Sequence, residues 1–238
     1  MASKRFKGKP CAYCSDGIAE TQGDHVIPRA LLPERLRKNP IKVPCCKRCG
    51  DLKSRAEHYA VSVLPFAGRH ASAADTLGMV EARLAKNRSL AHELREGLSE
   101  HVTEQGETLK AVRLEADKLA DFVGYVVRGL ANHHWRDRIG NPSEFHVELV
   151  NPEGDQVLVS QLLEKNGDRV SGDLGEGHLL YQATRSVGEP SFSVWRLTLL
   201  GGSEFAGEGP ALASAYWAIT GDPRVVSSFR ETLRMGEE

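Results

Sequence analysis

Two cysteine pairs share one spacing: Cys11-Ala-Tyr-Cys14 and Cys46-Lys-Arg-Cys49. Two intervening residues let one tight turn present both sulfurs to a single metal ion. All five cysteines of the chain lie between positions 11 and 49. The pattern therefore predicts a structural zinc site with four thiolate ligands, Cys11, Cys14, Cys46 and Cys49.

Cysteines at this spacing can also have roles other than zinc binding. A redox dithiol and unligated thiols remain alternatives for a C-x-x-C pair. A disulfide scaffold needs a secreted context. The N-terminus, Met1 to Pro10, is positively charged but has no apolar segment behind it, so we expect no secretion signal and a cytoplasmic protein. Cys45 is left over, and we expect a small buried residue there, although it can exchange roles with Cys46.

Composition and charge narrow the class of protein. The chain has 238 residues, of which 40% are hydrophobic and 26% are charged, which argues against disorder. No apolar run reaches the roughly 18 residues of a membrane helix, so no membrane partner is expected. Residues 1–60 contain thirteen Lys and Arg against six Asp and Glu, whereas the remainder contains eighteen against twenty-six. A basic segment on an acidic body indicates a local site for an anionic partner, with chance clustering as the alternative.

Between the cysteine pairs lies Gly23-Asp24-His25-Val26-Ile27-Pro28. A carboxylate beside a histidine offers a metal ligand and a base at adjacent positions. An isolated Asp-His pair before a proline turn is usually a surface feature. That interpretation is less convincing inside a zinc ribbon with basic surroundings.

The order of these motifs resembles the zinc-knuckle HNH endonucleases of the ββα-metal (His-Me finger) superfamily. The resemblance covers about residues 8–65. It implies that His25 activates water as a general base and that Asp24 holds one divalent ion, Mg²⁺ or Mn²⁺, against the scissile phosphate. A weaker resemblance, to a C-terminal extension of some bacterial and phage HNH proteins, involves residues 128–134 and a strand near Trp195.

One ligand of the family pattern is missing. The helix ligand commonly follows the last knuckle cysteine, where this chain has Gly50. Asp51 comes next and is an oxygen ligand suited to Mg²⁺ or Mn²⁺, and His58 lies two helical turns further on. Asn39 is the nearest candidate for the middle asparagine, at a different spacing. Either Asp51 or His58 substitutes, or the site is impaired.

Basic side chains around the Asp-His pair are expected to neutralise phosphates without reading sequence, although each alone is a solvated charge. They are Arg29, Lys42, Lys47, Arg48, Lys53 and Arg55.

The first hypothesis is a metal-dependent endonuclease acting on DNA, with RNA as an open alternative. The second is a catalytically impaired zinc-ribbon protein that binds nucleic acid. The third, a zinc-stapled protein-interaction module, is disfavoured by the clustered positive charge. A nuclease that makes two nicks needs two sites, so a homodimer is one expected arrangement.

The fold class predicted is α+β. A ββα-metal finger stapled by the four-cysteine zinc site is expected in residues 1–66, a helical connector in 67–105 and a mixed α+β domain in 106–238. Hydrophobic periodicity and turn residues set the expected elements. These are helices at 51–65, at 75–100 with a second N-cap at Ser89, at 115–135 and after Asp222-Pro223, and strands at 107–114, 145–149, 157–159, 179–185 and 192–200.

Overall fold

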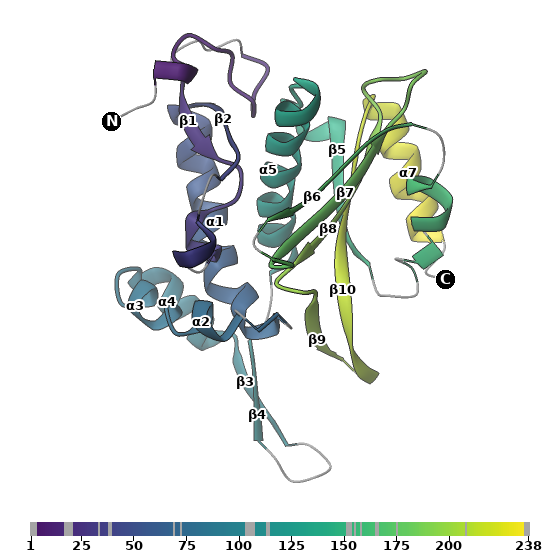
Figure 1. Ribbon diagram of the computed structural model, residues 1–238. Coiled ribbons are helices and arrows are strands. Elements are labelled where there is room, and N and C mark those ends of the chain that lie inside the picture. The colour runs from purple at the N-terminus through teal and green to yellow at the C-terminus, as the bar shows by residue number, and fades with distance from the viewer. Residues whose placement is uncertain are drawn as a thin grey trace.

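The computed structural model describes residues 4–16, 21–32, 34–37, 40–68, 70–71, 73–102, 108–112, 115–150, 154, 156–157, 159–164, 167–174, 176–207 and 209–235. Together they form a mixed α+β protein in which helices pack on both faces of a large antiparallel sheet (Figure 1). No helix within those ranges is long and apolar enough to cross a membrane.

A two-stranded hairpin followed by a long helix forms one side of the molecule (Figure 1). Strands β1 (Thr21–His25) and β2 (Lys42–Cys46) are antiparallel and place His25 opposite Lys42. Helix α1 (Lys47–Ala67) begins directly after β2, because the Cys46 side chain accepts a hydrogen bond from the Cys49 N–H. The order of elements in this part of the chain is strand, strand, helix.

Helix α1 is longer than the predicted helix at 51–65 and continues through Pro65. Proline has no N–H to donate to the carbonyl four residues earlier, which here belongs to Val61. The Arg83 guanidinium donates to that carbonyl instead, at 3.2 Å. The last turn of α1 therefore survives because a neighbouring helix supplies the missing donor.

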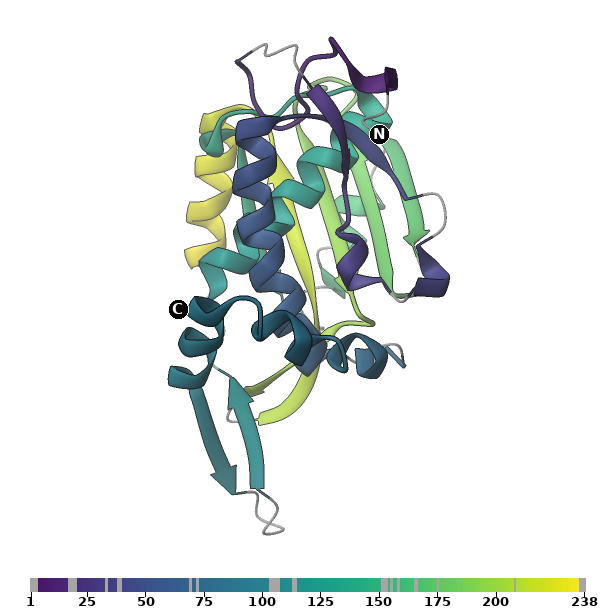
Figure 2. The ribbon, with the colours of Figure 1, turned by 90° about the vertical axis from the view of Figure 1, so that its left-hand side faces the viewer.

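Three short helices occupy the region where the sequence predicted a helical stretch at 75–100 with a second N-cap at Ser89. They are α2 (Ala73–Leu77), α3 (Val80–Leu84) and α4 (Arg88–Glu96). Asn87 caps α4 by accepting from the Leu90 N–H at 3.1 Å, so the break precedes the predicted cap, Ser89. Strands β3 (Leu98–Val102) and β4 (Thr108–Val112) then form a hairpin that projects from the body (Figure 2).

Helix α5 (Ala116–Trp135) lies between α1 and the large sheet, as both ribbon views show (Figures 1 and 2). The strands run in the order β5-β10-β8-β7-β6, and β9 pairs with β10. Helix α7 (Pro223–Met235) covers the opposite face. The strand bounds are β5 (Phe145–Val150), β6 (Asp168–Leu174), β7 (Leu179–Arg185), β8 (Ser193–Leu199), β9 (Ser203–Gly207) and β10 (Gly209–Thr220). Short 3₁₀ turns occupy Lys4–Phe6, Arg29–Leu31, Glu34–Leu36 and Pro142–Glu144.

The predicted helix at 115–135, the hairpin of 179–185 with 192–200 and the last helix are confirmed. The strand expected at 157–159 is wrong, because Val159–Leu163 forms a helical turn. The strand that pairs with β5 is instead β10, which brings Tyr216 opposite Leu149. Residues from all three predicted segments, such as Val26, Leu94 and Trp195, belong to one buried core.

Candidate functional site

The side chains of Cys11, Cys14, Cys46 and Cys49 converge where the N-terminal loop meets the start of α1. Their sulfur atoms all lie within 4.8 Å of one another, and all four residues are buried. None of the cysteines forms a disulfide. Such a soft, four-sulfur donor set can hold a metal ion such as zinc.

Backbone N–H groups point at two of the four sulfurs, those of Cys11 and Cys46. The N–H groups of Cys46 and Tyr13 lie 3.3 and 3.4 Å from the Cys11 sulfur, and the Cys49 N–H lies 3.5 Å from the Cys46 sulfur. The Cys45 thiol and these backbone donors hold the pKa of Cys11 at about 4, although burial opposes them. A thiolate is the form that binds metal. Cys45 lies outside the group of four, and its thiol donates to the Cys46 carbonyl at 3.2 Å.

Lys53 joins the end of β1 to α1. Its ammonium lies 2.7 Å from the His25 carbonyl and 3.1 Å from a carboxylate oxygen of Asp24, and it also pairs with Glu57. The Lys53 side chain is 1% exposed. The sequence predicts Lys53 as a contact to nucleic acid, and this prediction is wrong. The side chain is buried between two carboxylates, so it cannot reach an external phosphate.

Asp24 is held from a second direction by Tyr13. The Tyr13 hydroxyl donates to the same Asp24 oxygen, Oδ2, at 2.9 Å. Burial raises the pKa of Tyr13 well above its usual value, and the Asp24 charge raises it further, so the hydroxyl keeps its proton. Burial likewise raises the pKa of Glu57, against the effect of Lys53. Asp24 is therefore held in place through one of its two carboxylate oxygens, Oδ2.

His25 ends β1 and is half-buried. Burial lowers its pKa, and the nearby Lys42 and Arg29 cations lower it further, while Asp24 opposes them. The imidazole is therefore neutral near pH 7. Its Nδ1 atom is buried and has no hydrogen-bond partner among the described residues. A buried nitrogen without a partner is costly unless a ligand or water meets it.

Asp51 does not lie with Asp24 in one metal site, as the sequence analysis expected. It is exposed on α1 and pairs with Lys47 at 2.6 Å. Asp51 precedes Lys53 by two positions, which turns it about 200° around the helix, away from the side that meets β1. Gly50 faces Cys45, whose sulfur lies 3.5 Å from where a Cβ would be. His58 is exposed, and Asn39 lies outside the described residues.

Sequence reasoning missed Tyr13 and Glu57. Glu57 follows Lys53 by four positions, and residues at this spacing lie side by side on a helix. That spacing was a readable signal that the two side chains act together. Tyr13 gave no such signal, because it occupies one of the variable positions between Cys11 and Cys14.

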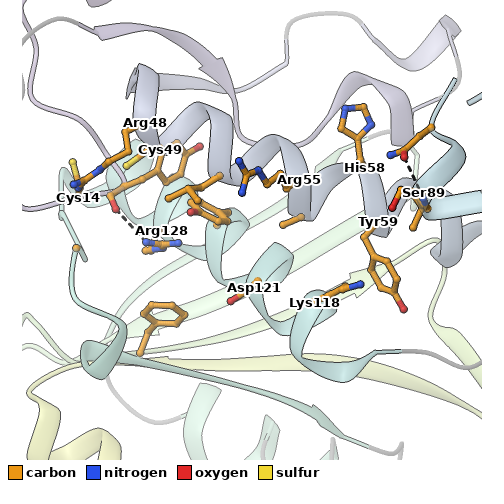
Figure 3. Close-up of a pocket in the computed structure, with 18 of the residues that line it drawn as sticks. Cys14, Arg48, Cys49, Arg55, His58, Tyr59, Ser89, Lys118, Asp121 and Arg128 are labelled. Atoms are coloured by element: carbon orange, nitrogen blue, oxygen red, sulfur yellow. Dashed lines mark hydrogen bonds between the residues drawn. The ribbon is translucent and has the colours of Figure 1, made fainter. Parts of the chain in front are cut away.

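The remaining predicted basic residues are spread over the surface. Arg29, Lys42, Lys47, Arg48 and Arg55 are all exposed. Arg48 pairs with Asp16, whereas Arg55 forms no ion pair with the described residues. Arg48 and Arg55 line a groove of about 840 Å³ between α1 and α5 (Figure 3). The structure thus divides these cations between the β1–β2 hairpin and the two sides of α1.

The junction of β1, β2 and α1 therefore combines a four-sulfur cluster, a fixed carboxylate and a neutral, half-buried histidine. A scan against protein-family models, a search of curated proteins and a search of solved structures each found no match to this chain.

Proposed function

We propose that the chain binds nucleic acid and cleaves its phosphodiester backbone, as the resemblance to HNH endonucleases implies. The observation that carries the proposal is His25, a neutral, half-buried imidazole at the end of β1. It lies beside exposed Lys42 and Arg29, whose charges attract phosphate. A general base must be neutral at the working pH, and His25 meets that condition.

In this proposal zinc is structural. Cys11, Cys14, Cys46 and Cys49 would hold it, and the bound ion would tie the N-terminal loop to the first turn of α1. It would supply folding stability to the hairpin and helix that carry His25. No step of hydrolysis is assigned to it.

The Lys53 contacts fix the position of the base. Lys53 holds the His25 carbonyl and the Asp24 carboxylate together, so the end of β1 cannot move relative to α1. The His25 imidazole then accepts a proton from a water molecule that attacks phosphorus, the P–O bond opposite the water breaks, and the leaving oxygen takes a proton from solvent. Fixing the base lowers the entropic part of the barrier.

The predicted divalent ion does not fit the residues that were expected to hold it. Asp24 is already bonded to Lys53 and Tyr13, and Asp51 lies on another side of α1. In the part of the chain that the structure describes, the cysteine cluster is the only group of three or more potential ligands that lie together. No step is therefore derived through Mg²⁺ or Mn²⁺.

One observation favours a second function, nucleic-acid binding without cleavage. The Lys53 ammonium lies between Asp24 and Glu57, so a fixed organic cation occupies the place between two carboxylates where a divalent ion would bind. A protein built in this way keeps the fold and the basic surface while it lacks the ion. The two proposals make opposite predictions about cleavage.

Nicking of a supercoiled plasmid separates them. Wild type, His25→Ala and the matched control His92→Ala, an exposed histidine on α4, are compared with Mg²⁺, Mn²⁺ or EDTA. Nicking that is lost only in His25→Ala supports the nuclease. Equal nicking by His25→Ala and wild type overturns it. Binding of DNA that weakens with salt, without nicking by any of the proteins, supports the second function.

A further inference from the structure

The groove between α1 and α5 is a second candidate site, distinct from the Asp24–His25 pair. Its volume of about 840 Å³ falls within the roughly 300–1,000 Å³ typical of small-molecule sites. One wall is a single side of α1, where Arg48, Leu52, Arg55 and Tyr59 recur at helical spacing. Neither Asp24 nor His25 lines it.

A buried arginine lines the opposite wall. Arg128 on α5 is 7% exposed, and its guanidinium donates to the carbonyls of Tyr13 and Gly124 at 3.1 and 3.2 Å. These bonds use two of the five N–H donors of an arginine. No carboxylate of the described residues pairs with it. The rings of Tyr125 and Phe145 lie 4.2 and 4.9 Å from its central carbon and support the charge.

Burying a cation without an anion is expensive, which is why buried arginines usually have a carboxylate partner. The charge of the Arg128 guanidinium, by contrast, is not neutralised by a carboxylate of the described residues, and the group lies beside a cavity. Arg55 also has no acidic partner among the described residues. These two arginines line the groove from opposite walls, and a planar guanidinium suits the oxygens of a phosphate.

The groove changes character along its length (Figure 3). Arg48 and Arg128 lie near the end formed by Cys14 and Cys49, and Tyr59, Ser89 and Lys118 lie at the other end. Lys118 is already paired with Glu93 and Glu115. Between the ends lie the charged side chains of Arg55 and Asp121. Leu52 also lines the groove, is 46% exposed and adds apolar surface. The groove therefore combines cationic groups with an apolar side chain.

We propose that this groove binds a nucleoside monophosphate, with its phosphate on Arg55 and Arg128 and its base against Leu52. The charge distribution favours one phosphorylated small molecule over a strand that runs the length of the groove. A strand would carry phosphates past Asp121 and Glu93, whose carboxylates line the other part. A base, by contrast, has amino groups that such carboxylates accept.

Calorimetry with the full-length, metal-loaded protein tests this site. The probes are the four ribonucleoside 5′-monophosphates, the corresponding nucleosides and inorganic phosphate. We expect at least one monophosphate to bind saturably, and its nucleoside to bind at least about tenfold more weakly because charged hydrogen bonds are lost. Arg55→Ala is expected to weaken binding by about tenfold as well, whereas the matched control Arg95→Ala, exposed on α4, leaves it unchanged.

A second variant guards against a folding artefact. Arg128→Lys keeps the charge but loses the planar fork, so weaker phosphate binding with unchanged metal content and circular dichroism supports the proposal. Absence of saturable binding by all four monophosphates at millimolar concentration overturns it. So does binding that neither Arg55→Ala nor Arg128→Lys weakens. If only single-stranded DNA binds, and does so through Arg55, the groove is part of the nucleic-acid surface and the small-ligand proposal fails. His25→Ala retains monophosphate binding, which keeps this test separate from the nuclease test.

Discussion

Two buried cations, Lys53 on helix α1 and Arg128 on helix α5, have different surroundings. Lys53, toward β1, lies between the carboxylates of Asp24 and Glu57. Arg128, across the groove on α5, contacts carbonyl oxygens, the Tyr125 hydroxyl and aromatic rings, and no carboxylate of the described residues pairs with it. The first charge is neutralised and holds two elements together. The second charge is kept, so it is the one available to an external anion.

The largest expected effect comes from substitution in the four-cysteine cluster, because the surroundings of both Lys53 and Arg128 depend on that cluster. Cys49→Ala removes one of four ligands and should abolish stoichiometric zinc binding and cooperative folding of the N-terminal residues. Structural zinc contributes on the order of 10 kcal/mol in small domains. Zinc content and thermal unfolding measure the effect. Cys45→Ala is the matched control, because Cys45 lies outside the cluster, and loss of zinc in both variants would contradict the assignment.

Replacing each cation by methionine tests the contrast directly. Lys53→Met leaves Asp24 and Glu57 without their cation and should destabilise the protein by about 3–5 kcal/mol. Arg128→Met removes a donor from two carbonyls and from the Tyr125 hydroxyl and should cost about 1–3 kcal/mol. Urea unfolding of both variants supplies the comparison. A larger loss for Arg128→Met would show that Arg128 has an unrecognised anionic partner.

His178 illustrates a third way of burying a basic group, which is to keep it neutral. Burial lowers its pKa from 6.5 to about 4, and His70 and Arg35 add to the effect. The unfolded chain therefore binds a proton that the folded protein does not, and stability falls as pH decreases from about 6.5 to about 4, by up to about 3 kcal/mol. Unfolding of wild type and His178→Leu across this range measures the difference. An unchanged pH dependence in the variant would show that His178 is not the responsible group.

Asp51→Ala should have the smallest effect. Asp51 and Lys47 are an exposed pair within one turn of α1, and such pairs contribute little. Plasmid nicking and DNA binding by the variant should match those of wild type. Loss of cleavage that depends on added Mg²⁺ would instead place Asp51 in the site and contradict its position on α1.

Local sequence signals predicted the local structure. The cysteine spacing anticipated the cluster, and the alternation around Trp195 anticipated the hairpin of β7 and β8. The long strand β10 was missed, because it is defined by pairing with β5 and β8, which lie far away in the sequence. Patterns within a short window cannot show such pairing.

The site was predicted less completely, because position in a motif does not determine which side of a helix a residue occupies. Asp51 was chosen for its distance from Cys49 along the chain. Lys53 was treated as a solvated charge, because a lysine in a polar helix is usually exposed. Counting helical turns would have placed Lys53 and Glu57 on one side of α1 and Asp51 on another.

Tyr13 has a consequence that extends beyond its own bonds. Its hydroxyl holds Asp24, its carbonyl holds Arg128, and its N–H points at the Cys11 sulfur. Tyr13 thus contacts the four-sulfur cluster, the end of β1 and the wall of the groove. Thermodynamic reciprocity then applies: if metal binding orders Tyr13 and so strengthens anion binding at Arg128, the anion must strengthen metal binding by the same factor.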